Sequence, residues 1–180
     1  MNSRMHQNEI MLPQGDSWIS RVKERASTNM NQYESCTQSL LAPFLEEFGI
    51  NNPMVMRSAG AMFGGMVSSL TCGIHTAGLM VLGLLMGREK LKEGMDGLFP
   101  IVPPAQELIR RLNKRLGSHS CKELTGVDFT DLNQAMAFYT SKGHETCISR
   151  VGEGAEEIAL FLKEINDKGE LFRFGNHTQK

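Results

Sequence analysis

Apolar residues recur at intervals of three and four along most of the chain, the spacing of one face of an α-helix. The clearest early stripe predicts a helix that begins at Glu34 or Ser35 and stops at Gly49, a residue favoured after a helix C-terminus. Pro43 falls inside this stripe and should kink the helix or separate its first turn. The apolar positions of the stripe are Cys36, Leu40, Leu41, Phe44, Leu45 and Phe48.

The same spacing continues through the rest of the body, and no segment shows the strict alternation of a half-buried strand. The sequence therefore predicts an all-α protein, a compact bundle of about five to six helices with short connections. Cys121 is expected in a loop or turn between two of these helices. The further helices are expected from Met54 to Met62, from about Cys72 to Gly87, from Pro103 to Gly117, from a cap at Asp128 or Thr130 through Tyr139, and from about Glu145 to Asn166. The buried stripe expected for the helix after Cys72 is Cys72, His75, Leu79, Leu82 and Met86, and that of the last helix is Ile148, Val151, Ala155, Ile158, Leu162 and Ile165.

The ends of the chain differ from this body. Residues 1–32 form a polar N-terminal arm, residues 33–166 the helical domain, and residues 167–180 a C-terminal tail. Within the arm, a short amphipathic helix is expected to start near Asp16 or Ser17. Its apolar side chains, Trp18, Ile19 and Val22, would pack on the main body.

The segment from Ser58 to Gly87 contains no Asp, Glu, Lys or Arg, and it is long enough to span a bilayer. It is also rich in glycine and interrupted by polar residues, which favours two helices buried in a protein core over a membrane span. The first residues are polar and lack the apolar run of a signal peptide. We therefore expect a cytoplasmic protein.

Composition excludes several classes of function. The net charge of -1, with no cluster of Lys or Arg, gives no reason to expect nucleic-acid binding. No paired carboxylates, phosphate loop or nucleophile triad stands out, so a conventional hydrolase or kinase has no support. Apolar residues make up 41% of the chain, which is ordinary for a globular domain.

Candidate chemistry lies with four cysteines, Cys36, Cys72, Cys121 and Cys147. Three of them have a histidine two or three residues away: His75, His119 and His144. Thiolate and imidazole are ligands of zinc and of iron–sulfur clusters, although these spacings do not match the usual zinc patterns. Four separate buried thiols with chance histidine neighbours are the alternative.

Cys72 and His75 lie on one face at the start of a predicted helix. The positive end of a helix favours a thiolate, which would make Cys72 the reactive cysteine. Gly73 and His75 are the candidate cofactor-binding residues beside it.

The order and surroundings of the four cysteines resemble the four-cysteine redox-active family named for its pattern, C-GCAxxG-C-C. The similarity extends from about Tyr33 to Glu164. It includes the run that starts at Cys72, the preceding stretch Phe63-Gly64-Gly65-Met66, and the segment after Gly117 that carries Cys121. The chain departs from the family pattern at Ile74 and Ala77, and neither departure removes a thiol.

The resemblance implies that Cys36, Cys72, Cys121 and Cys147 converge in one redox site. They would either hold an iron–sulfur cluster, as metal ligands, or carry out thiol–disulfide and electron-transfer chemistry, as in an oxidoreductase with a redox partner protein. The alternative is a non-catalytic helical module that binds partners and has a structural zinc or buried cysteines. A homo-oligomer is compatible with either function.

Overall fold

The structure is a computed structural model that describes residues 10–171. It is all α-helical: within that range the backbone forms no strand, only an isolated antiparallel bridge between Thr71 and Ser120. This confirms the predicted fold class. The helices are α1 (Ser17–Tyr33), α2 (Cys36–Glu47), α3 (Pro53–Ser58), α4 (Gly73–Met86), α5 (Gly94–Leu98), α6 (Val102–Leu116), α7 (Cys121–Thr125), α8 (Leu132–Thr140) and α9 (Glu145–Asp167), with single turns at Gly65–Ser69, Leu91–Glu93 and Phe99–Ile101.

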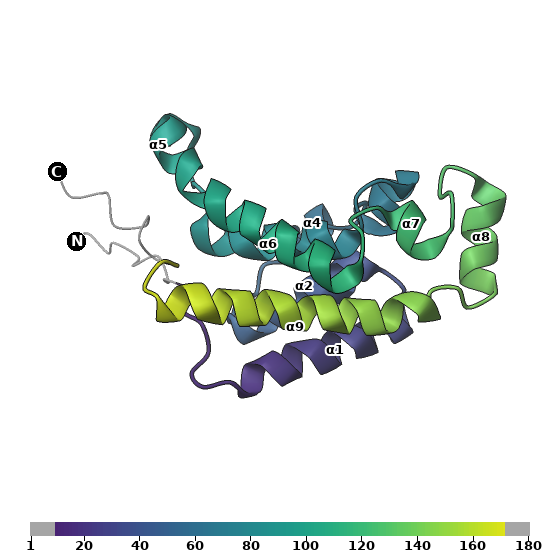
Figure 1. The fold of residues 1–180 in the computed structure, drawn as a ribbon, viewed down its shortest axis with the longest axis horizontal. Helices are drawn as coiled ribbons and strands as arrows, with labels where there is room; N and C mark the ends of the chain where they lie inside the picture. The colour runs from purple at the N-terminus through teal and green to yellow at the C-terminus, as the bar shows by residue number, and fades with distance from the viewer. Residues whose placement is uncertain (1–9, 172–180) are drawn as a thin grey trace.

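The long helix α9 is the centre of the bundle (Figure 1). It packs against α1, α2, α4 and α6, and α2 also packs against α4. The apolar stripe predicted for this helix faces the core: Val151, Ala155, Ile158 and Leu162 have no exposed surface. Helices α7 and α8 lie at the end of the bundle where α9 begins, and α5 projects from the opposite end (Figure 1).

Helix α1 begins at Ser17, as expected, and its apolar face is part of the main core. Trp18 is 1% exposed, and its ring lies edge-on to Phe44 of α2, with 6.3 Å between ring centroids. Val22 and Ala26 are fully buried against the same core. Asp16 stands at the N-cap position, but its side chain makes no capping hydrogen bond.

Pro43 was expected to kink α2 or to separate its first turn, and the second of these alternatives is wrong. The helix is continuous from Cys36 to Glu47. A proline has no N–H to give to the carbonyl four residues earlier, which here belongs to Ser39. The side-chain amide of Asn29 in α1 donates to that carbonyl at 3.4 Å and so replaces the missing backbone bond.

Three details of the sequence prediction were wrong. The helix expected to reach Met62 ends at Ser58, and the chain continues in turns from Ala59. The N-cap of α8 is Asp131, whose carboxylate accepts from the backbone N–H groups of Asn133 and Gln134. Leu79, predicted to be in the buried stripe of α4, is 37% exposed, whereas the other members of that stripe are buried together with Ile74 and Val81.

The charge-free segment from Ser58 to Gly87 contains the 14-residue helix α4, whose buried side chains belong to the main core. Among residues 10–171, no helix combines the length and the apolar character needed to cross a bilayer.

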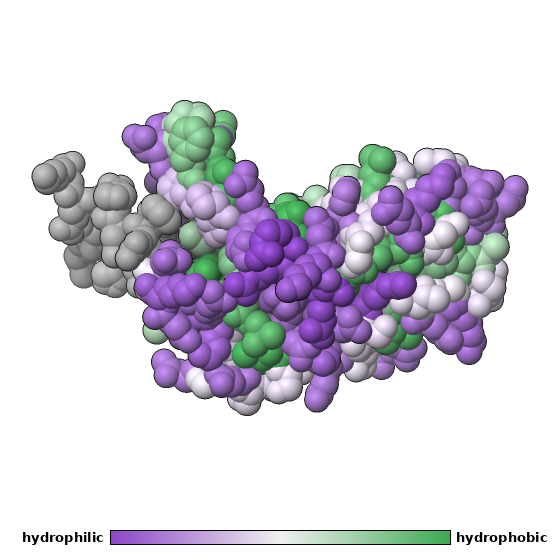
Figure 2. Space-filling view, in the orientation of Figure 1, coloured by the Kyte–Doolittle hydropathy of each residue, from purple (hydrophilic) through white to green (hydrophobic). Residues whose placement is uncertain are grey.

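The projecting segment around α5 carries apolar side chains on its surface, visible as a green area in Figure 2. Leu91 is 83% exposed, Phe99 58% and Met95 53%. The rest of this face of the bundle is largely polar, since charged residues cover α6 and α9 (Figure 2).

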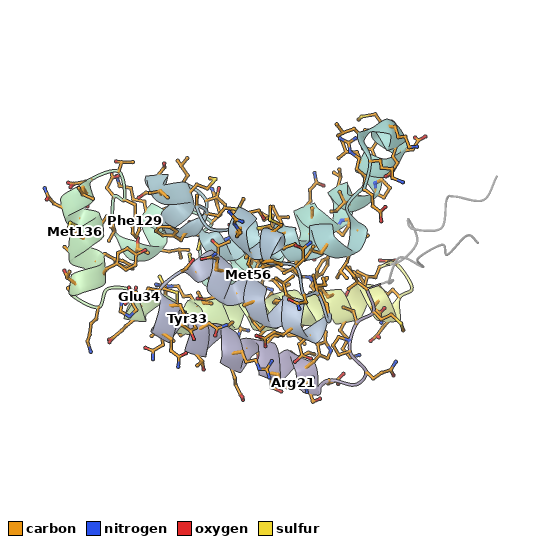
Figure 3. All side chains as sticks on the ribbon, turned by 180° about the vertical axis from the view of Figure 1, so that it is seen from behind. Arg21, Tyr33, Glu34, Met56, Phe129 and Met136 are labelled. Carbon is orange, nitrogen blue, oxygen red and sulfur yellow. The ribbon has the colours of Figure 1, made fainter. Side chains whose placement is uncertain are left out.

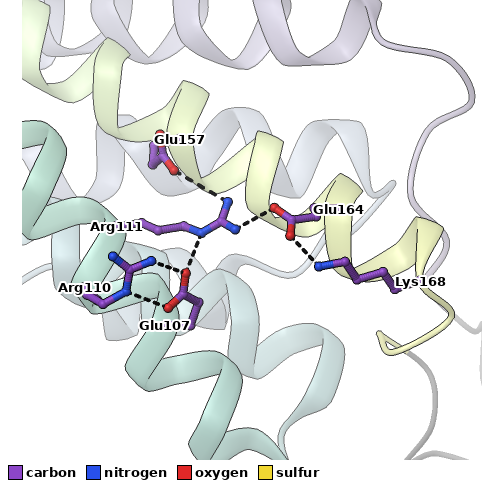
Figure 4. A network of polar contacts seen from close by, with 6 residues as sticks. All are labelled: Glu107, Arg110, Arg111, Glu157, Glu164 and Lys168. Atoms are coloured by element: carbon purple, nitrogen blue, oxygen red, sulfur yellow. Dashed lines mark hydrogen bonds and ion pairs between the residues drawn. The ribbon is translucent and has the colours of Figure 1, made fainter.

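A polar network joins the outer faces of α6 and α9 (Figure 4). Arg111 of α6 donates to Glu107 at 2.9 Å and to Glu164 of α9 at 2.5 Å. Its guanidinium also lies 5.1 Å from the centroid of the Phe161 ring. Exposed ion pairs contribute little individually, so this network adds little to the apolar packing between the two helices.

The backbone between α3 and α4 turns in the left-handed direction over four consecutive residues. Gly64, Gly65, Met66 and Val67 all have φ between 55° and 63°. Glycine adopts this region freely, but a β-branched residue such as Val67 does so at a cost of about 1–2 kcal/mol. Backbone strain of this kind persists only where the surroundings enforce it, and it concentrates at functional sites.

Replacing Val67 with asparagine should therefore raise the free energy of unfolding by about 1 kcal/mol, since asparagine tolerates left-handed backbone. The side chain of Val67 is 46% exposed, so little packing is lost. Chemical denaturation of the two proteins measures the change. Val67→Ile keeps the β-branch and serves as the matched control, for which no gain is expected. Equal stability of the asparagine and isoleucine variants would contradict backbone strain at Val67.

Candidate four-cysteine site

All four cysteines lie at the start of a helix. Cys36 is the first residue of α2, Cys121 is the first residue of α7, Cys72 is the N-cap of α4, and Cys147 is the third residue of α9. Cys121 was expected in a loop or turn, and the structure places it in a short helix instead. Each cysteine is therefore at the end of its helix where backbone N–H groups have no partner within the helix.

Backbone hydrogen bonds hold the segments of Cys72 and Cys121 side by side. The N–H of Cys72 donates to the carbonyl of His119, and the N–H of Cys121 donates to the carbonyl of Leu70, both at 2.7 Å. These bonds flank the antiparallel bridge between Thr71 and Ser120. Two cysteines that are far apart in the sequence are thereby fixed on neighbouring backbone segments.

Glycines allow the close approach of these segments. A Cβ atom on Gly73 would lie 2.4 Å from Sγ of Cys36 and 2.4 Å from Oγ1 of Thr37, so the start of α2 rests directly on Gly73. A Cβ atom on Gly65 would lie 2.7 Å from Cβ of Cys121. Gly73, predicted as a binding residue, thus makes space for a thiol of the site.

The four cysteines all border one small cavity of about 30 Å³. Its wall is completed by three aromatic rings, Phe129, Phe138 and Tyr139, which contact one another with centroid distances of 5.3 to 6.3 Å. Glu34, the C-cap residue of α1, lies at the same end of the molecule as Phe129 (Figure 3). The cavity is therefore a mostly apolar space at the end where the helices carrying the thiols begin.

Comparison with known families agrees with this arrangement. Residues 34–160 match the family model described as "Putative redox-active protein (C_GCAxxG_C_C)". The chain belongs to this family. The matched range contains all four cysteines and most of the helical bundle. No curated protein and no solved structure matches the chain.

The C_GCAxxG_C_C cysteines are all thiols in this structure, and burial is the main influence on their acidity. Burial raises the pKa of Cys121 to about 12, and the neighbouring Cys36 and Cys147 add to the shift. Burial also raises the pKa of Cys36 and of Cys147. The site therefore disfavours more than one thiolate at a time. Each thiolate would lose hydration in the buried site, and the negative charges would repel one another.

Cys72 does not have the lowered pKa that its helix position predicted. The N–H of Ile74 does favour its thiolate, but burial and the nearby Cys36 raise the pKa of Cys72 far above its usual value. Cys72 is 7% exposed, so desolvation exceeds the stabilisation that a helix terminus provides. Cys36 and Cys147, in contrast, are only partly buried.

The histidines near the cysteines do not line the cavity. His75 is fully buried, and its Nε2 lies 3.0 Å from Oδ1 of Asn113 in α6. Burial lowers its pKa, which favours a neutral ring. His119 is exposed and contributes its backbone carbonyl to Cys72. His144 precedes α9 and its Nε2 lies 3.7 Å from Glu34.

A metal was one predicted occupant of these cysteines. Four thiols are the correct donor set for an iron–sulfur cluster or for zinc. Among residues 10–171, however, no group of three or more Cys, His, Asp or Glu side chains is arranged to hold a metal ion. The donor type fits but the arrangement does not, so no chemical step is assigned to a metal.

Sequence patterns missed several residues of the cavity. Glu34 and Arg150 border it, each within three residues of a cysteine, and neither was predicted as a site residue. The three aromatic residues come from the segment around α8, where only a helix was expected. Their spacing carries no distinct signal, since Phe138 and Tyr139 are adjacent and Phe129 precedes the helix.

Proposed function

We propose that the four cysteines form one redox centre that exchanges electrons with a partner protein by thiol–disulfide chemistry. The observation that carries this proposal is the single cavity bordered by Cys36, Cys72, Cys121 and Cys147, which come from four different helices. Membership of a redox-active family supports the same chemistry. The chain then acts as an oxidoreductase or electron-transfer protein.

The environment suits a reversible dithiol. An apolar wall of aromatic rings limits water around the sulfurs, and partial exposure of Cys36 and Cys147 gives an incoming disulfide a point of attack. In the exchange, a thiolate attacks one sulfur of the partner disulfide and releases the other as a thiolate. A second thiol of the site then attacks the mixed disulfide. The partner is released in its reduced form, and a disulfide remains in the site.

A redox titration of the purified protein tests the proposal. The reduced protein is equilibrated with mixtures of reduced and oxidised glutathione, quenched with acid, and its remaining thiols are counted by alkylation and mass spectrometry. We expect the thiol count to fall in steps of two with a defined midpoint potential. A variant with serine at all four positions is the control. Four free thiols at every potential would refute the proposal.

Metal analysis separates the alternatives with the same protein. An iron–sulfur cluster, which the thiol donors would support after rearrangement, predicts bound iron and sulfide with absorbance at about 320–450 nm after anaerobic purification. The alternative of a non-catalytic module predicts zinc or no metal and no midpoint potential. Thiol–disulfide exchange predicts a midpoint potential in metal-free protein.

A further inference from the structure

Two of the four thiols must react first in this exchange. The packing of α2 on α4 distinguishes one pair of thiols from the other two. The N-terminal ends of these two helices meet directly. The missing Cβ of Gly73 leaves the space that Sγ of Cys36 and Oγ1 of Thr37 occupy. Because Gly73 follows Cys72 in the chain, the sulfur of Cys36 lies against the backbone that carries Cys72.

Cys36 also influences the rest of the site electrostatically. Burial is the larger cause of the raised pKa of the other three cysteines and of Tyr139, and a thiolate at Cys36 raises each of these pKa values further. Cys147, the other partly buried thiol, has a different environment, in which Thr146 and Arg150 favour its thiolate.

Backbone N–H groups converge on Cys36 from three segments. Those of Thr37 in α2, Gly73 in α4 and Gly64 in the left-handed turn all favour its thiolate, against the effect of burial. The helices that contribute here have 12 and 14 residues, so each has a substantial dipole. At Cys72, the N–H of Ile74 acts in this way.

From this geometry we infer that Cys36 and Cys72 are the primary redox pair, with Cys36 as the attacking thiolate and Cys72 as the resolving thiol. The inference rests on the proposed function and specifies its first step. The Cys36 thiolate attacks a disulfide, forms a mixed disulfide and releases one thiolate. Cys72 loses its proton and attacks the Cys36 sulfur, which releases the second thiolate. Two protein thiols are oxidised and one disulfide is reduced to two thiols.

Oxidised glutathione tests this order of events. Wild-type protein is treated for a short time, quenched, and its disulfides are mapped by peptide mass spectrometry. We expect the bond between Cys36 and Cys72 to form before any bond involving Cys121 or Cys147. In Cys72→Ser the mixed disulfide should accumulate on Cys36, since the resolving thiol is gone. In Cys36→Ser the attack on glutathione disulfide should slow about tenfold or more.

The outcomes separate this inference from the redox proposal. Gly83→Ala lies in α4 away from the cavity, so it is the control and should form the Cys36–Cys72 bond at the wild-type rate. In Cys121→Ser and Cys147→Ser, the Cys36–Cys72 bond should still be the first to form. A first bond between Cys121 and Cys147, or adduct on Cys147 in Cys72→Ser, would overturn the pair assignment while leaving a redox centre. No disulfide in wild-type protein would overturn both. The wild-type map remains decisive if a serine variant does not fold.

Discussion

Replacing Trp18 with alanine is expected to lower the free energy of unfolding by about 3–5 kcal/mol. Trp18 is 1% exposed and contacts the rings of Phe44 and Phe48, at centroid distances of 6.3 and 6.5 Å. Truncation removes this aromatic cluster and leaves a cavity between α1 and α2. Denaturant unfolding followed by far-ultraviolet circular dichroism measures the loss.

Tyr33→Ala is the matched control for that experiment. Tyr33 ends the same helix, but it is 69% exposed, so its truncation should change the stability little. A small effect for both variants would mean that α1 is a dispensable arm. A large effect for Trp18 alone would show that α1 is needed for the stability of the four-cysteine domain, although its residues precede the matched family range.

Replacing Gly73 with alanine is expected to reduce stability by about 1–3 kcal/mol and to displace the Cys36 thiol. The new methyl group would lie 2.4 Å from Sγ of Cys36, a distance that forces α2 and α4 apart. Thermal unfolding gives the stability. The rate of Cys36 alkylation in the folded protein gives the exposure of the thiol, which should increase.

Gly83→Ala is the internal control, because it lies in the same helix with nothing within 4 Å of the added methyl group. It should stabilise the protein by up to about 1 kcal/mol, since alanine favours a helix over glycine. If Gly73→Ala behaved like Gly83→Ala, the close contact between Gly73 and Cys36 would be refuted.

The sequence predicted the helices well because their apolar stripes are long and regular. For α9, the predicted range differs from the observed one by a single residue, and the predicted core positions Val151, Ala155 and Ile158 are buried. The stripe of α4 was less informative. That helix is apolar around most of its circumference, so the spacing alone did not distinguish Leu79 from the buried Val81.

The sequence identified the four cysteines and their family, but it did not predict how their surroundings affect the thiols. The order of the cysteines identified the family, and all four do border one cavity. Helix position predicted an acidic Cys72, whereas the surroundings of that thiol in three dimensions raise its pKa. The left-handed turn from Gly64 to Val67 was also missed, since Met66 and Val67 give no local signal for positive φ.

The position of every cysteine at the start of a helix has a consequence for the energetics of the whole bundle. A disulfide between two such residues would fasten one helix end to another and restrict the unfolded chain. Any free energy by which the bond stabilises the fold must, by thermodynamic reciprocity, make the folded protein harder to reduce by the same amount. The oxidised bundle should therefore melt at a higher temperature than the reduced bundle, by an amount linked to the midpoint potential of the centre. A mutation in the distant core changes that potential only where it changes the stabilities of the two forms by different amounts.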